Sequence, residues 1–250
     1  MNIDKLYYIN LAKRPDRNEH FLNECKKAGI PSDLIQRFSG FDGDTYPFDK
    51  DDLELFKNVS YIGEKFEKKV IGNQLSHYYI LKEMVAKQYN HILICQDDVL
   101  FKSDFIAHFE KLMKHIPDDA EIVNIGFHED LMYGESVPWN LNSTDDICEL
   151  CETKVNDYVC HLNYFMRTGS LAYIVPLKGA VRLLDYFQEN GFLKETDHNY
   201  NDYLLDKNIF YGSTTVLCTG NPALGSDIFG EAQDDCSTKT TITYLQSNPK

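Results

Sequence analysis

The feature that most constrains the fold is a short apolar run that ends abruptly in polar and acidic residues. Residues 91–95 read His-Ile-Leu-Ile-Cys, and Gln96, Asp97 and Asp98 follow at once. An apolar run of this length between polar segments is typical of a buried strand. Open α/β sheets bind ligands at the carboxyl ends of their strands, where these carboxylates would lie. The run therefore predicts an α/β domain with a ligand site at this strand end.

The rest of the chain alternates short apolar runs with amphipathic segments, which predicts a layered α/β arrangement. The expected strands are residues 6–11, 91–95, 121–127, 171–175 and 209–218, and the expected helices are residues 15–28, 73–89, 104–116, 180–187 and 201–205. Pro15 suits a first helical turn, Gly29 and Gly191 suit positions just after a helix, and Asn73 and Ser103 are candidate N-caps. Residues 40–70 are polar and are expected to form a long loop.

The charge of the chain limits what it can bind. At 250 residues the formal net charge is −14, which argues against nucleic acid as a partner. An anionic ligand would need a cation between itself and the protein. Asp97 and Asp98 offer hard oxygen ligands suited to Mg²⁺ or Mn²⁺, which can in turn hold a diphosphate. The alternative is that the two aspartates only begin a solvated loop.

The N-terminus has no basic segment followed by an apolar one, so we expect no secretory signal and a cytoplasmic location. No apolar run approaches the ~20 residues that a membrane span needs. The chain has seven cysteines. Cys148, Cys151, Cys160 and His161 could hold zinc, but their spacing is not that of a common zinc module, and loose thiols or a disulfide are the alternatives.

Six blocks of sequence, taken in order, carry a resemblance to a known family. They are residues 8–17, 37–43, 72–77, 94–99, 196–198 and 221–228. Residues 8–17 include Arg14, Pro15 and Arg17 and are similar to an opening strand with an Arg-Pro-x-Arg turn, and residues 94–99 are similar to a Leu-Glu-Asp-Asp-Val motif. In this order the blocks resemble glycosyltransferase family 25, the group of lipooligosaccharide and collagen hydroxylysine galactosyltransferases.

The resemblance implies a fold and a reaction. The fold would be the α/β GT-A (Rossmann-like) glycosyltransferase fold, with a mixed central sheet flanked by helices. Residues 1–250 would form one domain, with a nucleotide-sugar half at about 1–130 and an acceptor half at about 131–250. The reaction would be inverting transfer of a hexose, galactose first, from a UDP-sugar to a glycan or a hydroxylysine-type, collagen-like acceptor, with Mn²⁺ or Mg²⁺. A homodimer is left open.

The resemblance also gives roles to individual residues. Asp98 would be the main metal ligand, and Asp227 would complete the metal shell or contact the acceptor, with His198 as a competitor for the first of those roles. Asp197 would be the catalytic base, although an aspartate there is also typical of a helix N-cap. The residues expected to bind the donor are Asn10, Leu11, Arg14, Arg17, Asp42, Gly43, Ser76, His77, Gln96 and Asp97.

Several of these residues also have structural interpretations. Arg14 and Arg17 suit phosphate at a helix start, or are surface charges. Asp42 suits a nucleoside pocket, or is a turn residue before Gly43. His77 could reach donor hydroxyls or phosphate, or be a buried histidine of the core.

One departure from the family concerns the metal motif, where Gln96 stands in place of a glutamate. A neutral amide can coordinate through its oxygen or bind the ribose, but it removes one negative charge. This difference motivates a second hypothesis, a nucleotide-sugar-binding relative that is catalytically weak or inactive. A third hypothesis is a receiver-like phosphotransfer domain, but such domains place their acidic pair nearer the start of a shorter chain.

Overall fold

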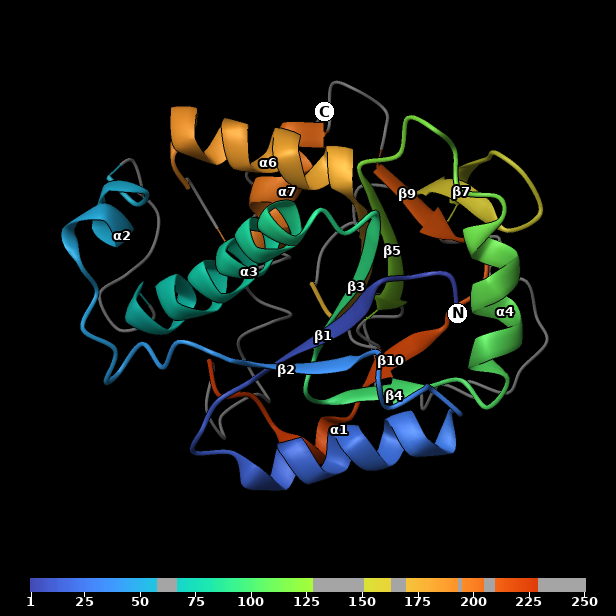
Figure 1. The fold of residues 1–250 in the computed structure, drawn as a ribbon, viewed down its shortest axis with the longest axis horizontal. Coiled ribbons are helices and arrows are strands. Elements are labelled where there is room, and N and C mark those ends of the chain that lie inside the picture. The colour runs from blue at the N-terminus through green and yellow to red at the C-terminus, as the bar shows by residue number, and fades with distance from the viewer. Residues whose placement is uncertain (58–66, 128–150, 163–169, 193–194, 205–209, 229–250) are drawn as a thin grey trace, which may run out of the picture.

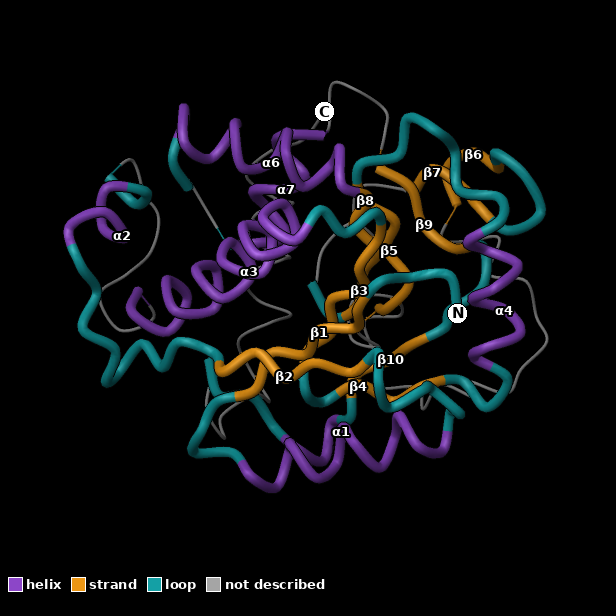
Figure 2. Tube along the Cα trace, in the orientation of Figure 1, coloured by secondary structure: helices purple, strands orange, loops and turns teal. Residues whose placement is uncertain are grey.

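A computed structural model describes residues 1–57, 67–127, 151–162, 170–192, 195–204 and 210–228. The strands are β1 Lys5–Asn10, β2 Ile35–Ser39, β3 His91–Gln96, β4 Val99–Phe101, β5 Ile122–Phe127, β6 Cys151–Lys154, β7 Val159–Leu162, β8 Ala172–Pro176, β9 Phe210–Ser213 and β10 Cys218–Gly220. The helices are α1 Pro15–Lys27, α2 Lys50–Glu54, α3 Glu67–Lys87, α4 Phe105–Met113, α6 Leu177–Asn190, α7 Thr196–Leu204 and a 3₁₀ turn, Pro222–Leu224. Figures 1 and 2 show their arrangement.

The described strands form one mixed sheet. Its order is β2-β1-β3-β8-β5-β9-β7-β6, and β10 pairs with both β4 and β5. β1 is parallel to β2 and β3, whereas β8 runs antiparallel to its neighbours β3 and β5. The predicted α/β fold with a mixed central sheet is therefore confirmed.

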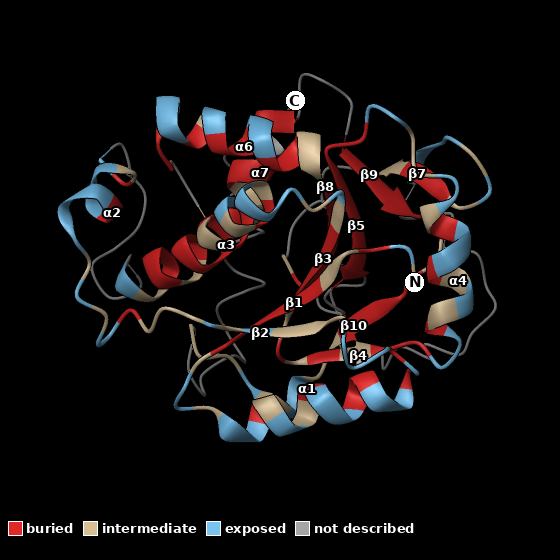
Figure 3. Ribbon diagram, in the orientation of Figure 1, coloured by how far each residue is buried: buried red, intermediate tan, exposed pale blue. Residues whose placement is uncertain are grey.

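Each face of the sheet is buried by its own set of helices. Leu75 of α3 and Leu183 of α6 belong to the hydrophobic cluster on one face, and Phe21 of α1 and Phe105 of α4 belong to the cluster on the other. Successive residues of β3 alternate between the two clusters, because side chains on a strand point to opposite faces. Both faces being covered explains why this strand is apolar without interruption (Figure 3).

Most of the predicted elements are confirmed, with shifts at their ends. α1 begins at Pro15, and Gly29 follows it with φ +74°, a left-handed conformation that glycine adopts readily. The strand predicted at 209–218 is instead two short strands, β9 and β10. β2 was not predicted, because its five residues are only partly buried and lack an apolar run. Ser103 is not an N-cap, since Asp104 takes that position before α4.

The prediction for residues 40–70 was wrong in part. α2 lies within this segment and begins with a capping box formed by Asp49 and Asp52. α3 already begins at Glu67, so Asn73 lies inside a helix and does not cap it. α7 likewise begins at Thr196, which places Asp197 in its first turn and not in an N-cap position. No helix among the described residues is long and apolar enough to cross a membrane.

The segment that leads from β2 packs tightly against the first half of α3. A Cβ atom at Gly72 would overlap the Phe41 carbonyl oxygen, and one at Gly43 would overlap the Lys68 carbonyl oxygen. Ser76 accepts a hydrogen bond from the Phe41 amide at 3.0 Å and donates one to the Gly72 carbonyl at 2.7 Å. These contacts fix the position of residues 41–43 beside the carboxyl ends of β1 and β2.

We expect Gly72→Ala to destabilise the protein, although alanine is the better helix former. Propensity alone would stabilise an exposed helix by about 1 kcal/mol. At Gly72 the added methyl group would displace the Phe41 carbonyl, and such overpacking costs about 1–3 kcal/mol. Urea unfolding measures the change, and Ala86→Gly on the exposed side of α3 calibrates the propensity effect. A more stable Gly72→Ala variant would contradict the packing.

Candidate functional site

The buried carboxylate of Asp97 connects the carboxyl end of β3 to residues of β1 and α1. Asp97 follows β3 and is 4% exposed. Its Oδ1 lies 2.8 Å from Arg17 Nη1, and its Oδ2 accepts a hydrogen bond of 2.7 Å from the Asn10 side-chain amide. Burial raises the pKa of the Asp97 carboxyl, while Arg17 and Asn10 favour its ionised form. The parallel pairing of β1 with β3 is what places Asn10 beside Asp97.

Arg17 also lies close to two further aspartates. Its Nη1 is 3.7 Å from Asp98 Oδ2 and 3.7 Å from Asp227 Oδ2. Its Nη2 donates to the carbonyl oxygens of Leu224 and Gly225. Three aspartates that lie far apart in the sequence, Asp97, Asp98 and Asp227, are thus gathered around one guanidinium.

Arg14 holds the same C-terminal segment. Its Nη1 donates to both carboxylate oxygens of Asp227, at 2.9 and 2.8 Å, and its Nη2 donates to Asp16 at 2.7 Å. The hydrogen bonds to Asp16 and Asp227 raise the pKa of Arg14. The backbone N–H of Asn221 donates to the Asp98 carbonyl oxygen at 2.8 Å. Residues 221–227 are therefore held at their start by Asp98 and at their end by Arg14.

The two predicted metal ligands differ in how well they fit a cation. Asp98 Oδ1 is buried and has no hydrogen-bond partner among the residues that the structure describes, an arrangement that needs an explanation such as a bound ion or water. Both oxygens of Asp227 are bonded to Arg14. Among the described residues, no group of three or more His, Cys, Asp or Glu side chains could hold a metal ion. Asp98 thus keeps one oxygen that the described residues do not satisfy, and Asp227 in this arrangement accepts hydrogen bonds from Arg14.

Two lysines that were not predicted complete a basic rim. Lys13 Nζ lies 2.8 Å from Asp42 Oδ2, and Lys69 Nζ donates to the Asp227 carbonyl at 3.0 Å. Partial burial works to raise the pKa of Asp42, but the hydrogen bond from Lys13 lowers it overall. Lys13 could have been found from its place beside Arg14. Lys69 could not, because the sequence placed it in a loop.

A second group of predicted residues surrounds His77. Gln96 Nε2 lies 3.0 Å from His77 Nε2, and His77 Nδ1 lies 2.6 Å from the Tyr173 hydroxyl. The Tyr173 hydroxyl lies in turn 3.1 Å from that of Tyr200. Burial lowers the pKa of His77 to about 3, so its ring is neutral. The interpretation of His77 as a buried histidine of the core is correct, and the histidine is also tied to the strand end.

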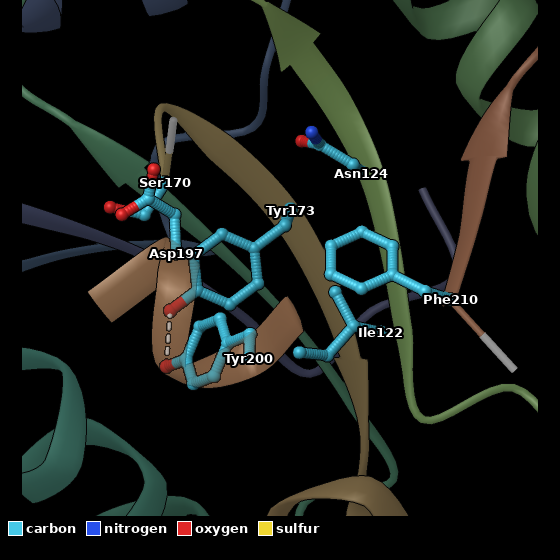
Figure 4. Close-up of a pocket in the computed structure, with 7 residues that line it drawn as sticks. All are labelled: Ile122, Asn124, Ser170, Tyr173, Asp197, Tyr200 and Phe210. Atoms are coloured by element: carbon cyan, nitrogen blue, oxygen red, sulfur yellow. Dashed lines mark hydrogen bonds between the residues drawn. The ribbon is translucent and has the colours of Figure 1, made fainter. Parts of the chain in front are cut away.

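Asp197 lies in the wall of a small cavity (Figure 4). The cavity is lined by Ile122, Asn124, Ser170, Tyr173, Asp197, Tyr200 and Phe210. Tyr173 and Tyr200 face each other across their hydroxyl groups in this view. The cavity wall therefore carries a carboxylate, three hydroxyls and an amide around a space of about 10 Å³, enough for one water molecule.

The predicted residues thus fall into three sets. Asn10, Arg14, Arg17, Asp97, Asp98 and Asp227 meet around Arg17, with Leu11 in the turn between β1 and α1. Gln96 and His77 lead by hydrogen bonds towards the cavity that Asp197 lines. Asp42, Gly43 and Ser76 belong to the contact between residues 41–43 and α3, where Ser76 is engaged by backbone groups. His198 is half-buried on α7.

The cysteines do not support the zinc alternative. Cys160 on β7 is disulfide-bonded, so it has no thiolate to offer. Cys148 lies outside the described residues, as does the side chain of Cys151. Cys25, Cys95 and Cys218 are free and buried. Disulfides are typical of oxidising compartments, and the cytoplasmic location stays a prediction.

Comparison with known proteins identifies relatives of the chain. Residues 3–200 match the model of glycosyltransferase family 25 (LPS biosynthesis protein). A probable inactive glycosyltransferase 25 family member 3 from Bos taurus is 27% identical over 194 residues, which cover 74% of this chain and 29% of the relative. Procollagen galactosyltransferase 2 from Homo sapiens is 28% identical over 131 residues, which cover 50% of this chain and 21% of the relative. The chain thus spans less than a third of the length of these curated relatives.

Solved glycosyltransferase structures are similar at a lower level. Mouse xyloside xylosyltransferase 1 has a TM-score of 0.40 and 12% identity, with 82% of this chain and 70% of that chain covered. The galactosyltransferase LgtC, in complex with donor and acceptor sugar analogs, has a TM-score of 0.39 and 10% identity, with 98% and 96% covered.

We expect Arg17→Gln to lower the free energy of unfolding far more than Arg14→Gln. Removing one partner of a buried ion pair costs about 3–5 kcal/mol, because the charge left behind stays buried. Arg14 pairs with Asp16, which is 55% exposed, and Asp227, which is 27% exposed, so its loss should cost about 1 kcal/mol or less. Urea unfolding measures both. Equal losses in the two variants would show that the buried Arg17–Asp97 pair contributes no more to stability than the exposed pairs of Arg14. Adding Asp97→Asn to Arg17→Gln should recover part of the lost stability, because the uncompensated buried charge is then removed.

Proposed function

The chain belongs to glycosyltransferase family 25, and we propose that it transfers a hexose from a UDP-sugar to a hydroxyl group, with inversion at the anomeric carbon. The single observation that carries this proposal is the buried oxygen of Asp98 beside Arg17 at the carboxyl end of β3, which has no hydrogen-bond partner among the described residues. A cation ligand next to a guanidinium group suits a diphosphate. Galactose is the first sugar to test, because a procollagen galactosyltransferase is among the relatives.

The charges near Asp98 support binding of an anionic donor. The chain carries a formal net charge of −14, which would repel a diphosphate at long range. Arg14, Arg17 and Lys69 nevertheless meet at Asp227, and Arg17 also lies 3.7 Å from Asp98. Arginine binds phosphate in a bidentate manner. Because these basic side chains are already paired with aspartates, a diphosphate would also need the cation on Asp98.

Asp98 would hold a divalent cation, Mn²⁺ or Mg²⁺. When bound, the cation neutralises the charge that develops on the departing diphosphate. The chain's own guanidinium groups stabilise the same charge from α1. Asp227 orients Arg14 by accepting two hydrogen bonds from it, and so it contributes to the donor site through that arginine.

Asp197 would act as the general base at the acceptor side. It takes the proton of the acceptor hydroxyl while that oxygen attacks the anomeric carbon and the bond to the UDP oxygen breaks. A glycan or a hydroxylysine-type, collagen-like acceptor has the required hydroxyl groups.

A second candidate is a nucleotide-sugar-binding protein with weak or no turnover. Both oxygens of Asp227 are bonded to Arg14, and Gln96 is neutral and bonds His77 through its Nε2, so Asp98 gains no free second carboxylate from these positions. The Bos taurus relative is itself named as probably inactive. A screen of UDP-sugars for UDP release decides between the two, because tight UDP binding without release from any donor favours this candidate.

We expect Asp98→Ala to abolish Mn²⁺-dependent release of UDP from UDP-galactose, with a loss of about 100-fold or more in turnover. The variant should also bind Mn²⁺ more weakly, measured by calorimetry in the presence of UDP. Asp104→Ala is the matched control, since Asp104 is a half-exposed aspartate that precedes α4. Equal Mn²⁺ affinity of Asp98→Ala and Asp104→Ala would remove Asp98 as a metal ligand.

We expect Asp197→Asn to leave UDP binding intact and to lower transfer by about 100-fold or more, because an amide cannot take the acceptor proton. Asp185→Asn on the exposed side of α6 serves as the control. Turnover is measured with an acceptor found by profiling with the best donor. Normal turnover of Asp197→Asn would assign the base to another residue.

A further inference from the structure

A chain of hydrogen bonds runs through the core from the donor side to α7. It links Gln96 of β3, His77 of α3, Tyr173 of β8 and Tyr200 of α7, with separations of 3.0, 2.6 and 3.1 Å. His77 is 1% exposed, Tyr173 2% and Tyr200 3%. Buried polar groups that bond in series polarise one another, so the orientation of one end affects the other.

The amide of Gln96 sets the direction of this chain. A neutral histidine has one nitrogen that donates and one that accepts. Gln96 Nε2 faces His77 Nε2, and when the amide N–H donates across this contact the ring hydrogen is on Nδ1. In the same arrangement Nδ1–H donates to the Tyr173 hydroxyl oxygen, and the Tyr173 hydroxyl donates to Tyr200. Every donor of this arrangement points from the strand end towards α7.

Asp197 lies at the far end of the chain. It precedes Tyr200 by three residues on α7, and the two residues line the same cavity. Burial, followed by the negative charge of Asp197, raises the pKa of Tyr200, which keeps its hydroxyl protonated. Because Tyr200 accepts from Tyr173, its own hydrogen is available to point towards the negative charge.

We propose that Gln96, His77 and Tyr173 are positioning residues that orient Tyr200 beside Asp197, so that the donor side of the site and the base of the acceptor side are aligned through one hydrogen-bond chain. The proposal deepens the proposed function and rests on it. An ionised glutamate at position 96 would change the chain, since a carboxylate only accepts. His77 would then carry hydrogen on Nε2, either in the opposite tautomer or as a cation.

The first test reads the tautomer of His77 without any enzyme activity. In full-length protein with ¹⁵N-labelled histidine, the His77 signals are identified by their loss in His77→Gln. We expect a neutral ring with hydrogen on Nδ1 in the wild type, and loss of that form in Gln96→Glu. A wild-type ring with hydrogen on Nε2 would overturn the proposed direction of the chain.

The second test uses turnover. Tyr173→Phe removes the hydrogen bonds of the central hydroxyl and should lower kcat of transfer about tenfold, with KM for the UDP-sugar unchanged. Tyr211→Phe is the matched control, because Tyr211 is a buried tyrosine whose hydroxyl donates to Asp119 at 2.9 Å, outside the chain. The double variant Tyr173→Phe/Tyr200→Phe should be no slower than the slower single variant, as expected for residues that act in series.

The outcomes separate this proposal from the proposed function. Turnover of Tyr173→Phe equal to that of Tyr211→Phe, or additive losses in the double variant, would overturn the positioning role while transfer itself stands. If the wild type releases no UDP from any donor, the proposed function fails. The His77 tautomer then still decides whether the chain has the direction described.

Discussion

A carboxylate as deeply buried as that of Asp97 is tolerated inside a protein only when a cation and hydrogen-bond donors face it. Arg17 and Asn10 supply both, and they do so from the first turn of α1 and the end of β1. The pair therefore requires β1, β3 and α1 to meet in one relative position. Because Arg17 also donates to the backbone of residues 224–225, the same requirement extends to a segment more than two hundred residues away.

The charged residues around the Arg17–Asp97 pair differ in their partners. Asp97 neutralises Arg17 from inside, while Asp227 is held by Arg14 at the surface of the same cluster. Asp98 is left with one oxygen that the described chain does not satisfy. The chain carries an excess of negative charge, yet Arg14, Arg17 and Lys69 all meet at Asp227, while Asp197 lines a separate cavity with hydroxyl and amide groups.

The local sequence pattern predicted those helices and strands whose positions depend mainly on neighbouring residues. The apolar run of β3 could be found because both faces of the sheet are covered, and the ends of α1 because Pro15 and Gly29 suit their positions. The start of α3 could not be found, because a glycine such as Gly72 is typical of a helix boundary. At this position the glycine instead lies inside the helix, where it leaves room for the Phe41 carbonyl group. The pairing of Asp227 with Arg14 spans 213 residues, and no local signal reports such a contact. The chain from Gln96 to Tyr200 crosses four elements and was equally beyond reach.

The position of β10 bears on the order in which the protein can be completed during synthesis. β10 pairs antiparallel with β4 and parallel with β5, and the residue after it donates to the Asp98 carbonyl. A ribosome-bound chain that ends before residue 218 would contain β1, β2 and β3 but would expose β4 as an unpaired edge. The edge of the sheet that carries Asp97 and Asp98 is therefore encoded early and closed late, and the edge of β4 stays open to strand addition until the last described segment emerges.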